Sequence, residues 1–437
     1  MNRLLIHELL QWQASDSRKP ILLDGARQVG KTYLLEHLFG KENFNNVHKL
    51  DFLANPSLSE LFDESLEPSI ILNNIEIHLN ISIDIKNDLI FFDEIGESQA
   101  AVNSLKYFSE QLPNAFICST GSNIGLLDSF PVGKVQILEL FPLCFEEFLM
   151  ASDNQKLLGA FKEQSRLKST HGLLWKALLD YYYVGGMPEA VNNWYKNNSK
   201  GMHERTEIVK QVHCNLIDGY LRDFGKYSGK VNAQHIESVF RNVPRQLSKN
   251  IDSSVKRFIF KDVIIKKQRY TELSSPINWL EKTKLISKCY PINSQPRMPL
   301  ASLVKENIFK LFFFDVGLLG HLLGMEYKDQ LDQSTSYKGY IAENFVQNEI
   351  RTHIGYPIYS WEEGQSEIEF LHRAQDGEII PIEVKSGSRT RAKSLTFYSK
   401  RYHPSNSIKL IGAAGGNNEN KSSLVWPLYY TQFLSNI

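Results

Sequence analysis

The sequence Gly25-Ala26-Arg27-Gln28-Val29-Gly30-Lys31-Thr32 decides the fold of the segment around it. It fits the pattern G-x-x-x-x-G-K-[ST], the P-loop or Walker A motif. The apolar residues 20–24 precede it and predict a short buried parallel strand. Leucines at helical spacing follow it in residues 34–39. The motif therefore lies at a strand-to-helix turn, which favours a phosphate site over an ordinary glycine-containing loop.

This setting gives the motif residues a physical role. Gly25 and Gly30 allow a tight turn, so the amides of residues 25–30 can point at phosphate oxygens. The helix that follows adds the positive end of its dipole. We expect Lys31 to reach the β- and γ-phosphates of a nucleotide and the Thr32 hydroxyl to bind Mg²⁺.

A second apolar strand, residues 88–94, ends in two carboxylates, Asp93 and Glu94. This is the Walker B pattern, in which the aspartate holds Mg²⁺ through water and the glutamate orients or deprotonates the attacking water. An acidic strand end more often caps a helix when it occurs alone. Because a P-loop precedes it here, we expect Asp93 and Glu94 to complete a nucleotide site.

A further strand, residues 115–119, ends in a polar segment that contains Thr120, Ser122 and Asn123. A side chain at this position would lie beside the Walker B strand and contact the γ-phosphate or the attacking water. Turn chemistry is an equal alternative, because these residue types favour turns. The sequence does not choose among the three, and we include Ser122 in the predicted nucleotide site.

Length and composition limit the number of domains and the kinds of partner that the chain can have. The chain has 437 residues, enough for about two to four domains. Lys and Arg total 49, as do Asp and Glu, so any nucleic-acid partner must be met by a local patch. The longest apolar run, residues 311–323, contains Asp315 and His321 and is too short to span a bilayer, so no membrane partner is expected.

The four cysteines are scattered, without metal-ligand spacing, and the histidines form no cluster. This pattern predicts reduced core thiols in a cytoplasmic protein and no zinc site. The N-terminus begins an amphipathic helix and shows no cleavable signal pattern.

Together with later stretches, these motifs resemble a group of prokaryotic AAA-type ATPases that carry a C-terminal DUF4143 domain. The later matching stretches are residues 129–149, 181–191, 310–324, 339–350 and 381–387. The resemblance implies ATP and Mg²⁺ as ligands, ATP hydrolysis, and a homo-oligomer with an arginine finger supplied in trans. Arg222 is one candidate for the finger, and a surface ion pair with Asp223 is the alternative.

The predicted fold class is α/β, with four parts along the chain. Residues 1–150 are expected to form the AAA-type P-loop ATPase core, a parallel sheet with helices on both faces. The resemblance implies a helical lid region in residues 151–230. We expect a winged-helix-like region in 231–300 and an α/β restriction-endonuclease-like domain in 301–437.

A basic run lies in residues 256–269, beside a strand-like segment, residues 257–260. Short helices next to a basic hairpin are what a winged-helix DNA reader requires, since cations neutralise phosphates. A solvated charged face is the alternative. The basic residues are Lys256, Arg257, Lys261, Lys266, Lys267 and Arg269.

Residues 339–437 read as helix, three strands, helix and strand, and resemble the PD-(D/E)xK nuclease fold. The strands are expected at 357–361, 367–372 and 379–385. In such a fold, carboxylates on neighbouring strands hold Mg²⁺ and a lysine helps to activate water. The predicted set is Glu343 from the helix, with Glu349 as its rival, Glu369 where the group normally has Asp, Glu383 and Lys385.

Residues 385–401 offer a second surface for nucleic-acid backbone, in which basic residues interleave with Phe397 and Tyr398. The basic residues after Lys385 are Arg389, Arg391, Lys393, Lys400 and Arg401.

The sequence thus predicts an ATP-hydrolysing protein whose nucleotide state is coupled to a nuclease-like domain that binds DNA or a partner. Two alternatives remain open. One is an active Mg²⁺-dependent DNA nuclease gated by ATP, and the other is a nucleotide-gated binding module without cleavage.

Overall fold

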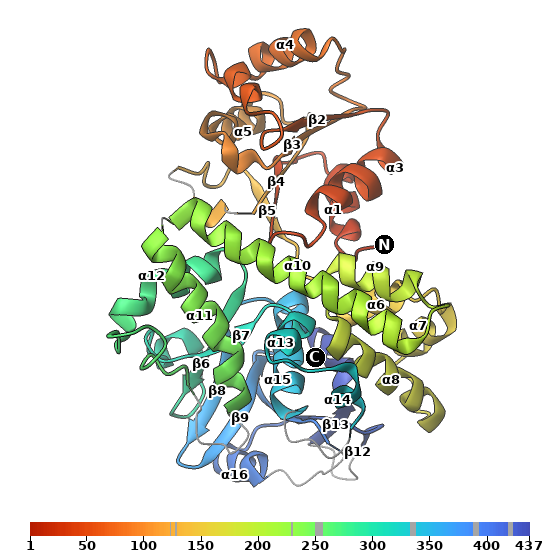
Figure 1. Ribbon diagram of the computed structural model, residues 1–437, viewed down its shortest axis with the longest axis vertical. Coiled ribbons are helices and arrows are strands. Elements are labelled where there is room, and N and C mark those ends of the chain that lie inside the picture. Colours follow the sequence, from red (N-terminus) through yellow and green to blue (C-terminus); the bar gives the residue numbers. More distant parts are fainter. Residues whose placement is uncertain are drawn as a thin grey trace. The chain divides into compact units, whose positions relative to one another are not determined.

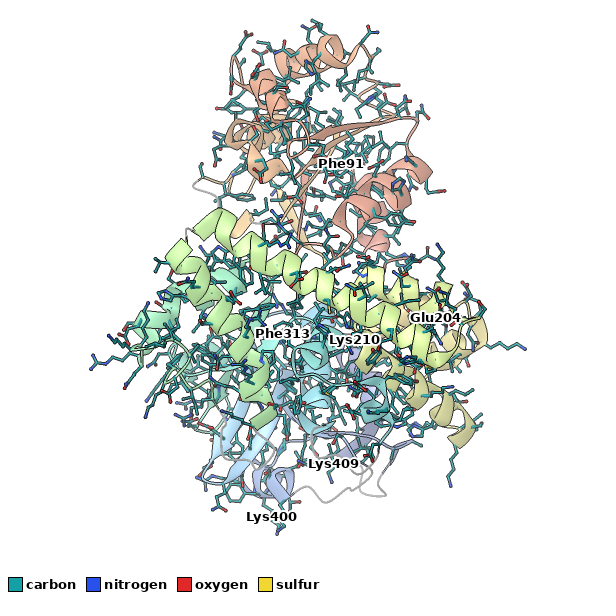
Figure 2. All side chains as sticks on the ribbon, viewed as in Figure 1. Phe91, Glu204, Lys210, Phe313, Lys400 and Lys409 are labelled. Carbon is teal, nitrogen blue, oxygen red and sulfur yellow. The ribbon has the colours of Figure 1, made fainter. Side chains whose placement is uncertain are left out.

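The computed structural model describes residues 1–122, 124–126, 129–228, 230–249, 257–332, 338–387, 393–417 and 423–437. These residues divide into two compact units (Figure 1). The N-terminal unit is Met1–Phe141 with Lys282–Lys284, and the C-terminal unit is Pro142–Glu281 with Leu285–Ile437. Each has its own sheet and core, in which Phe91 and Phe313 respectively are fully buried (Figure 2).

The N-terminal unit alternates strands with helices, as the sequence predicts. Its elements are α1(Ile6–Ala14), β1(Ile21–Asp24), α2(Lys31–Tyr33), the π-helix η1(Leu34–Gly40), α3(Lys41–Asn43), β2(Val47–Asp51), η2(Pro56–Phe62), α4(Pro68–Leu79), β3(Leu89–Asp93), η3(Ile95–Glu97), α5(Gln99–Gln111), β4(Phe116–Gly121), η4(Ile124–Leu126) and β5(Gln136–Glu139).

The described strands of this unit form a parallel sheet in the order β2-β3-β4-β1-β5. Strand β4 lies between β1 and β3, with Leu23 opposite Thr120 and Phe92 opposite Ser119. Since the strands are parallel, their carboxyl ends meet at one edge. The P-loop, the Walker B acids and the polar end of β4 therefore share that edge.

Both faces of this sheet are covered. On one side Phe92 packs with Phe62 and Phe108. On the other, Trp12 packs with Phe116 and Phe39. Burial on both faces explains why β1 and β3 are continuous apolar runs, and it confirms the predicted sandwich of helices around a parallel sheet.

The C-terminal unit begins with helices and ends in a mixed sheet. Its elements are α6(Phe145–Met150), α7(Gln155–Lys162), α8(Lys168–Val184), α9(Pro188–Lys196), α10(Met202–Ser228), α11(Lys230–Lys249), α12(Tyr270–Lys282), β6(Ile286–Ile292), η6(Leu300–Leu303), β7(Lys310–Phe313), α13(Val316–Leu322), α14(Tyr327–Leu331), α15(Lys338–His353), β8(Ile358–Glu363), β9(Ser366–Arg373), β10(Ile379–Lys385), α16(Lys393–Tyr402), β11(Ser407–Ile411), β12(Gly416–Asn417), β13(Ser423–Pro427) and η7(Leu428–Asn436). Within the described ranges, no helix is both long and apolar enough to cross a membrane.

The described strands of the C-terminal unit form one sheet in the order β12-β13-β11-β10-β9-β8-β6-β7. Helix α15 packs on β10, and α16 packs on β9. Trp361 of β8 anchors α16, since it is fully buried and meets the ring of Tyr398 edge-on at 5.0 Å. The succession α15-β8-β9-β10-α16-β11 confirms the order of elements predicted for residues 339–437.

The middle of the chain differs from expectation in two ways. Strands β6 and β7 pair antiparallel with each other, and β6 pairs parallel with β8, so the expected boundary near residue 300 lies inside one sheet. Residues 257–260 form no strand in the described structure; Phe258 instead donates its N–H to the carbonyl of Phe309 at 2.7 Å. Apolar strand partners that are distant in sequence decide this packing, and local spacing does not reveal them.

A tight backbone contact joins three distant segments of the C-terminal unit at Gly186, between α8 and α9. Its N–H donates to the Asp315 carboxylate at 2.6 Å, and its carbonyl accepts the N–H of Leu143 at 2.7 Å. A Cβ at residue 186 would lie 2.1 Å from the carbonyl oxygen of Leu143. Only glycine fits this approach.

We predict that Gly186→Ala lowers the free energy of unfolding of the C-terminal unit by about 1–3 kcal/mol, the usual cost of forcing atoms into a packed interior. Gly172→Ala is the control, because a Cβ at residue 172 in α8 meets nothing within 4 Å. It should stabilise by about 0.5–1 kcal/mol through helix propensity. Urea denaturation followed by circular dichroism measures both, and equal effects would contradict the packing argument.

Candidate functional site

The P-loop turn joins β1 to α2 with the geometry that a phosphate cradle needs. Gln28 and Gly30 have positive φ values of 63° and 94°. A Cβ on Gly25 would lie 2.3 Å from the carbonyl oxygen of Leu140, so this position also requires glycine. The loop leads through α2 into the π-helix η1, a helix type that recurs at functional sites.

Arg3 braces this turn from outside the motif. Its guanidinium donates to the carbonyl of Val29 at 2.7 Å and to that of Phe141 at 2.6 Å. Arg3 is 5% exposed. Arg3 was not predicted, since a single arginine ahead of the N-terminal helix α1 carries no motif signal.

Lys31 is buried, and its side chain folds back onto the P-loop backbone. Its ammonium donates to the carbonyls of Gly25 and Ala26, both at 2.9 Å, and to the Ser122 hydroxyl at 3.0 Å. Within the described residues all of its hydrogen bonds therefore go to uncharged oxygens. Burial lowers the pKa of Lys31 to about 8, although the carboxylates of Glu94 and Asp24 oppose the shift. The site thus holds a poorly neutralised cation.

Asp93, at the end of β3, is held by three side chains. Thr32 donates its hydroxyl to Asp93 at 2.9 Å and Thr120 does so at 2.5 Å, while Lys49 of β2 forms an ion pair with it at 2.8 Å. The structure therefore joins the predicted Walker A and Walker B residues directly. Lys49 was not predicted, although its place beside the Walker B strand was a possible signal.

Glu94 occupies a left-handed backbone conformation, with φ of 50°. Its N–H donates to the Thr120 hydroxyl at 3.0 Å, and its carboxylate accepts the hydroxyl of Ser122 at 3.1 Å. Strained backbone of this kind concentrates at functional sites. Ser122 consequently bridges Lys31 and Glu94, whereas Thr120 connects the two Walker B acids.

The residues present fit a nucleotide with its magnesium ion. The Thr32 hydroxyl and the Asp93 carboxylate supply adjacent oxygens, the ligand type that Mg²⁺ prefers. The buried Lys31 ammonium and the loop amides suit a polyphosphate. Of the other sequence candidates, Arg222 is exposed on α10, and Asn123 lies outside the described residues.

A second group of charged side chains lies on β9 and β10 of the C-terminal unit. Lys385 is 2.9 Å from Glu383 and 3.5 Å from Glu369, and the Val384 N–H donates to Glu369 at 3.1 Å. Burial, with the charges of nearby glutamates, raises the pKa of Glu369 to about 8 despite Lys385. Burial alone would lower the pKa of Lys385. The carboxylates of Glu369 and Glu383 have the larger effect and raise the pKa of Lys385 above its usual value.

The helix position of this group is Glu343, which forms an ion pair with Lys310 of β7. Burial alone would lower the pKa of Lys310. The charges of Glu343 and Glu367 have the larger effect and raise the pKa of Lys310 above its usual value. Lys310 was not predicted, because β7 precedes the helix and strands from which the nuclease-like residue set was chosen. The rival Glu349 contacts a different set of residues, Phe145 and His353.

The two basic segments are partly neutralised. Arg257 pairs with Glu362 at 2.6 Å, and Arg401 pairs with Glu363 at 2.8 Å. Lys400 is exposed on α16 (Figure 2). Lys256, Arg389 and Arg391 lie outside the described residues.

Two solved structures from Thermotoga maritima share low identity with the chain. A RuvB variant is 15% identical, over 69% of this chain and 91% of its own, with a TM-score of 0.31. A DNA polymerase III gamma subunit-related protein is 12% identical, over 78% and 99%, with a TM-score of 0.23. Both TM-scores are too low to carry an argument.

No curated protein matches the chain. Three family models do match parts of it. Residues 176–329 match a domain of unknown function, DUF8612. The family models further assign an AAA domain to residues 17–149 and a domain of unknown function, DUF4143, to residues 338–431.

Proposed function

We propose that the chain binds ATP with Mg²⁺ at residues 25–32 and hydrolyses it with the help of Glu94. The observation that carries the proposal is the junction of the two motifs, in which Thr32 and Asp93 are hydrogen-bonded at 2.9 Å. The buried Lys31 beside them supports it, because its charge lacks a touching carboxylate within the described residues. The AAA domain match over residues 17–149 supports ATP as the nucleotide.

In this proposal each side chain does one task. The amides of residues 25–30 and the Lys31 ammonium bind the phosphates and stabilise charge that spreads over the γ-phosphoryl group. Thr32 and Asp93 would hold Mg²⁺, which neutralises phosphate charge when bound. Glu94 orients the attacking water and accepts its proton, and Ser122 fixes the Glu94 carboxylate. Arg3 keeps the loop in place through Val29.

We extend the proposal to a cytoplasmic homo-oligomer in which a neighbouring copy supplies an arginine to the γ-phosphate. Arg222, exposed on α10, is the candidate from the sequence. An arginine supplied in trans would add a positive charge where charge develops on the γ-phosphoryl group, which is the role of such arginines in other phosphoryl-transfer enzymes.

The C-terminal unit is proposed to act as a nuclease-like domain that holds DNA or a partner without cutting, under the control of the nucleotide. Its acidic group is largely self-neutralised, because Lys310 pairs with Glu343 and Lys385 bridges Glu369 and Glu383. Burial raises the pKa of Glu369, so a metal ion that binds there must also displace a proton from this carboxyl group. Residues 256–269 and 385–401 would provide the cations for DNA.

An active nuclease gated by ATP is the second candidate. One Glu383 carboxylate oxygen favours it, since that oxygen is buried and has no hydrogen-bond partner among the described residues. Such an oxygen could accept a metal ion.

We expect Lys31→Ala to reduce ATP turnover by about 10²–10³-fold, the usual loss for one charge-stabilising donor. Glu94→Gln should lose about 10²–10⁴-fold in turnover while it still binds ATP, since it removes only the proton acceptor. Lys41→Ala is the matched control, because Lys41 is exposed and pairs with Glu36. Phosphate release measures turnover, and wild-type rates in both site variants would refute the proposal.

The affinity for Mg·ATP should fall at high pH. The Lys31 pKa is lowered to about 8, so its ammonium is present below pH 8 and is lost as the pH rises above it. The dissociation constant should therefore be about eightfold larger at pH 9 than at pH 7.5. Calorimetry measures this, with Lys31→Arg as the variant whose guanidinium stays charged and whose affinity stays level. A wild-type affinity that is unchanged between these pH values would contradict the role of Lys31.

Incubation of supercoiled, linear and branched DNA with Mg²⁺ or Mn²⁺, with and without ATP, separates the two candidates for the C-terminal unit. We expect retarded DNA in gels without cleavage, and less retardation at high salt. Cleavage by the wild type that is lost in Lys385→Ala, and kept in the exposed control Lys196→Ala, would establish the nuclease instead.

A further inference from the structure

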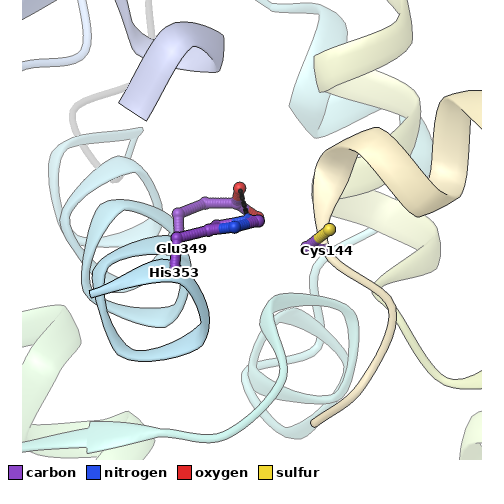
Figure 3. Close-up of side chains that lie close together, drawn as sticks. All are labelled: Cys144, Glu349 and His353. Atoms are coloured by element: carbon purple, nitrogen blue, oxygen red, sulfur yellow. Dashed lines mark ion pairs between the residues drawn. The ribbon is translucent and has the colours of Figure 1, made fainter. Parts of the chain in front are cut away.

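Three side chains of the C-terminal unit that play no part in the proposed ATP chemistry converge in its interior. Cys144 precedes α6, whereas Glu349 and His353 lie one turn apart on α15 (Figure 3). One potential ligand atom from each lies within 4.8 Å of the other two. Cys144 is 3% and Glu349 is 1% exposed. Sequence spacing hid the group, since about two hundred residues separate the cysteine from the other two, and no zinc site was expected.

Two potential ligand atoms of this group, one on Glu349 and one on His353, face each other at ion-pair distance. Glu349 accepts the N–H of Phe145 with one carboxylate oxygen, at 3.0 Å. Its second oxygen, Oε2, and the Nε2 atom of His353 lie 3.5 Å apart. Neither atom has a hydrogen-bond partner among the described residues. A buried ion pair that lacks a close hydrogen bond leaves both polar atoms incompletely satisfied, and a bound cation would satisfy them.

We propose that Cys144, Glu349 and His353 bind one Zn²⁺ ion that fastens the start of α6 to α15. Thiolate, imidazole and carboxylate together are ligands that Zn²⁺ accepts, whereas Mg²⁺ prefers oxygen alone.

The spacing is close to that of a zinc site. Zinc–ligand bonds of about 2.0–2.3 Å in a tetrahedron set ligand atoms about 3.3–3.8 Å apart. The oxygen and nitrogen of Glu349 and His353 already have such a separation, 3.5 Å. The sulfur of Cys144 lies within 4.8 Å of one potential ligand atom of each of the other two residues, somewhat farther than in a closed zinc site. Water would take the fourth position.

Electrostatics favours a divalent cation here. The carboxylates of Glu146 and Glu147 are also buried, and Glu147 accepts the N–H of Cys144 at 3.1 Å. Burial and these carboxylates raise the pKa of the Cys144 thiol, so without metal the sulfur keeps its proton. Zn²⁺ would displace the thiol proton and any imidazolium proton of His353 to solvent and leave both ligands in their binding forms.

The test uses the full chain, without nucleotide, reconstituted with Co²⁺ as a spectroscopic probe and with Zn²⁺. Thiolate-to-cobalt charge transfer in the near ultraviolet requires a bound sulfur, so it separates this site from the oxygen ligands of the nucleotide site. We expect one Zn²⁺ per chain by mass spectrometry and a cobalt charge-transfer band. Cys144→Ser should abolish the band, and His353→Gln should weaken Zn²⁺ affinity by at least about 100-fold.

Cys289→Ser is the matched control, because Cys289 is an equally buried thiol on β6 outside this group. It should keep both the band and the stoichiometry. Circular dichroism verifies that each variant is folded. If Cys144→Ser does not fold, the loss of Zn²⁺ affinity in His353→Gln tests the proposal instead. The absence of the band from the reconstituted wild type, or its persistence in Cys144→Ser, would overturn the proposal.

Discussion

The N-terminal unit depends on the enclosure of one cation. The Lys31 ammonium is buried and bonded only to neutral oxygens within the described residues, which costs free energy unless an anion arrives. A rigid frame must therefore hold it in place. The parallel sheet supplies that frame, since both of its faces are covered by apolar side chains and its carboxyl edge brings Asp93, Thr120 and Ser122 toward the loop.

The two charged groups of the molecule differ in how their charge is balanced. The P-loop presents the Lys31 ammonium, whose hydrogen bonds among the described residues all go to uncharged oxygens. The acidic group of the C-terminal unit already contains its own counter-ions, Lys310 and Lys385. A ligand that enters the first group gains a charge partner, while a metal that enters the second must displace an ammonium. This contrast explains why nucleotide binding is the better supported function.

Local sequence predicted much of this structure because the motifs are short and their residues adjacent. The strands around the P-loop, the pairing of Thr32 with Asp93 and the order of elements after residue 338 all follow from local patterns. What the sequence did not reveal comes from distant segments. Arg3 meets Val29, Lys310 meets Glu343, and β6 joins β8, each through tertiary packing that no spacing rule encodes.

The arrangement of β6 beside β8 has a consequence for dissecting the chain. The DUF4143 match starts at residue 338, so a fragment cut there would lose β6 and β7. Strand β8 would then become an open edge, with unpaired amides and carbonyls along its length. Such an edge recruits strands from other copies, and the excised fragment should therefore self-associate. A cut placed before β6 would retain both strands and keep that edge covered.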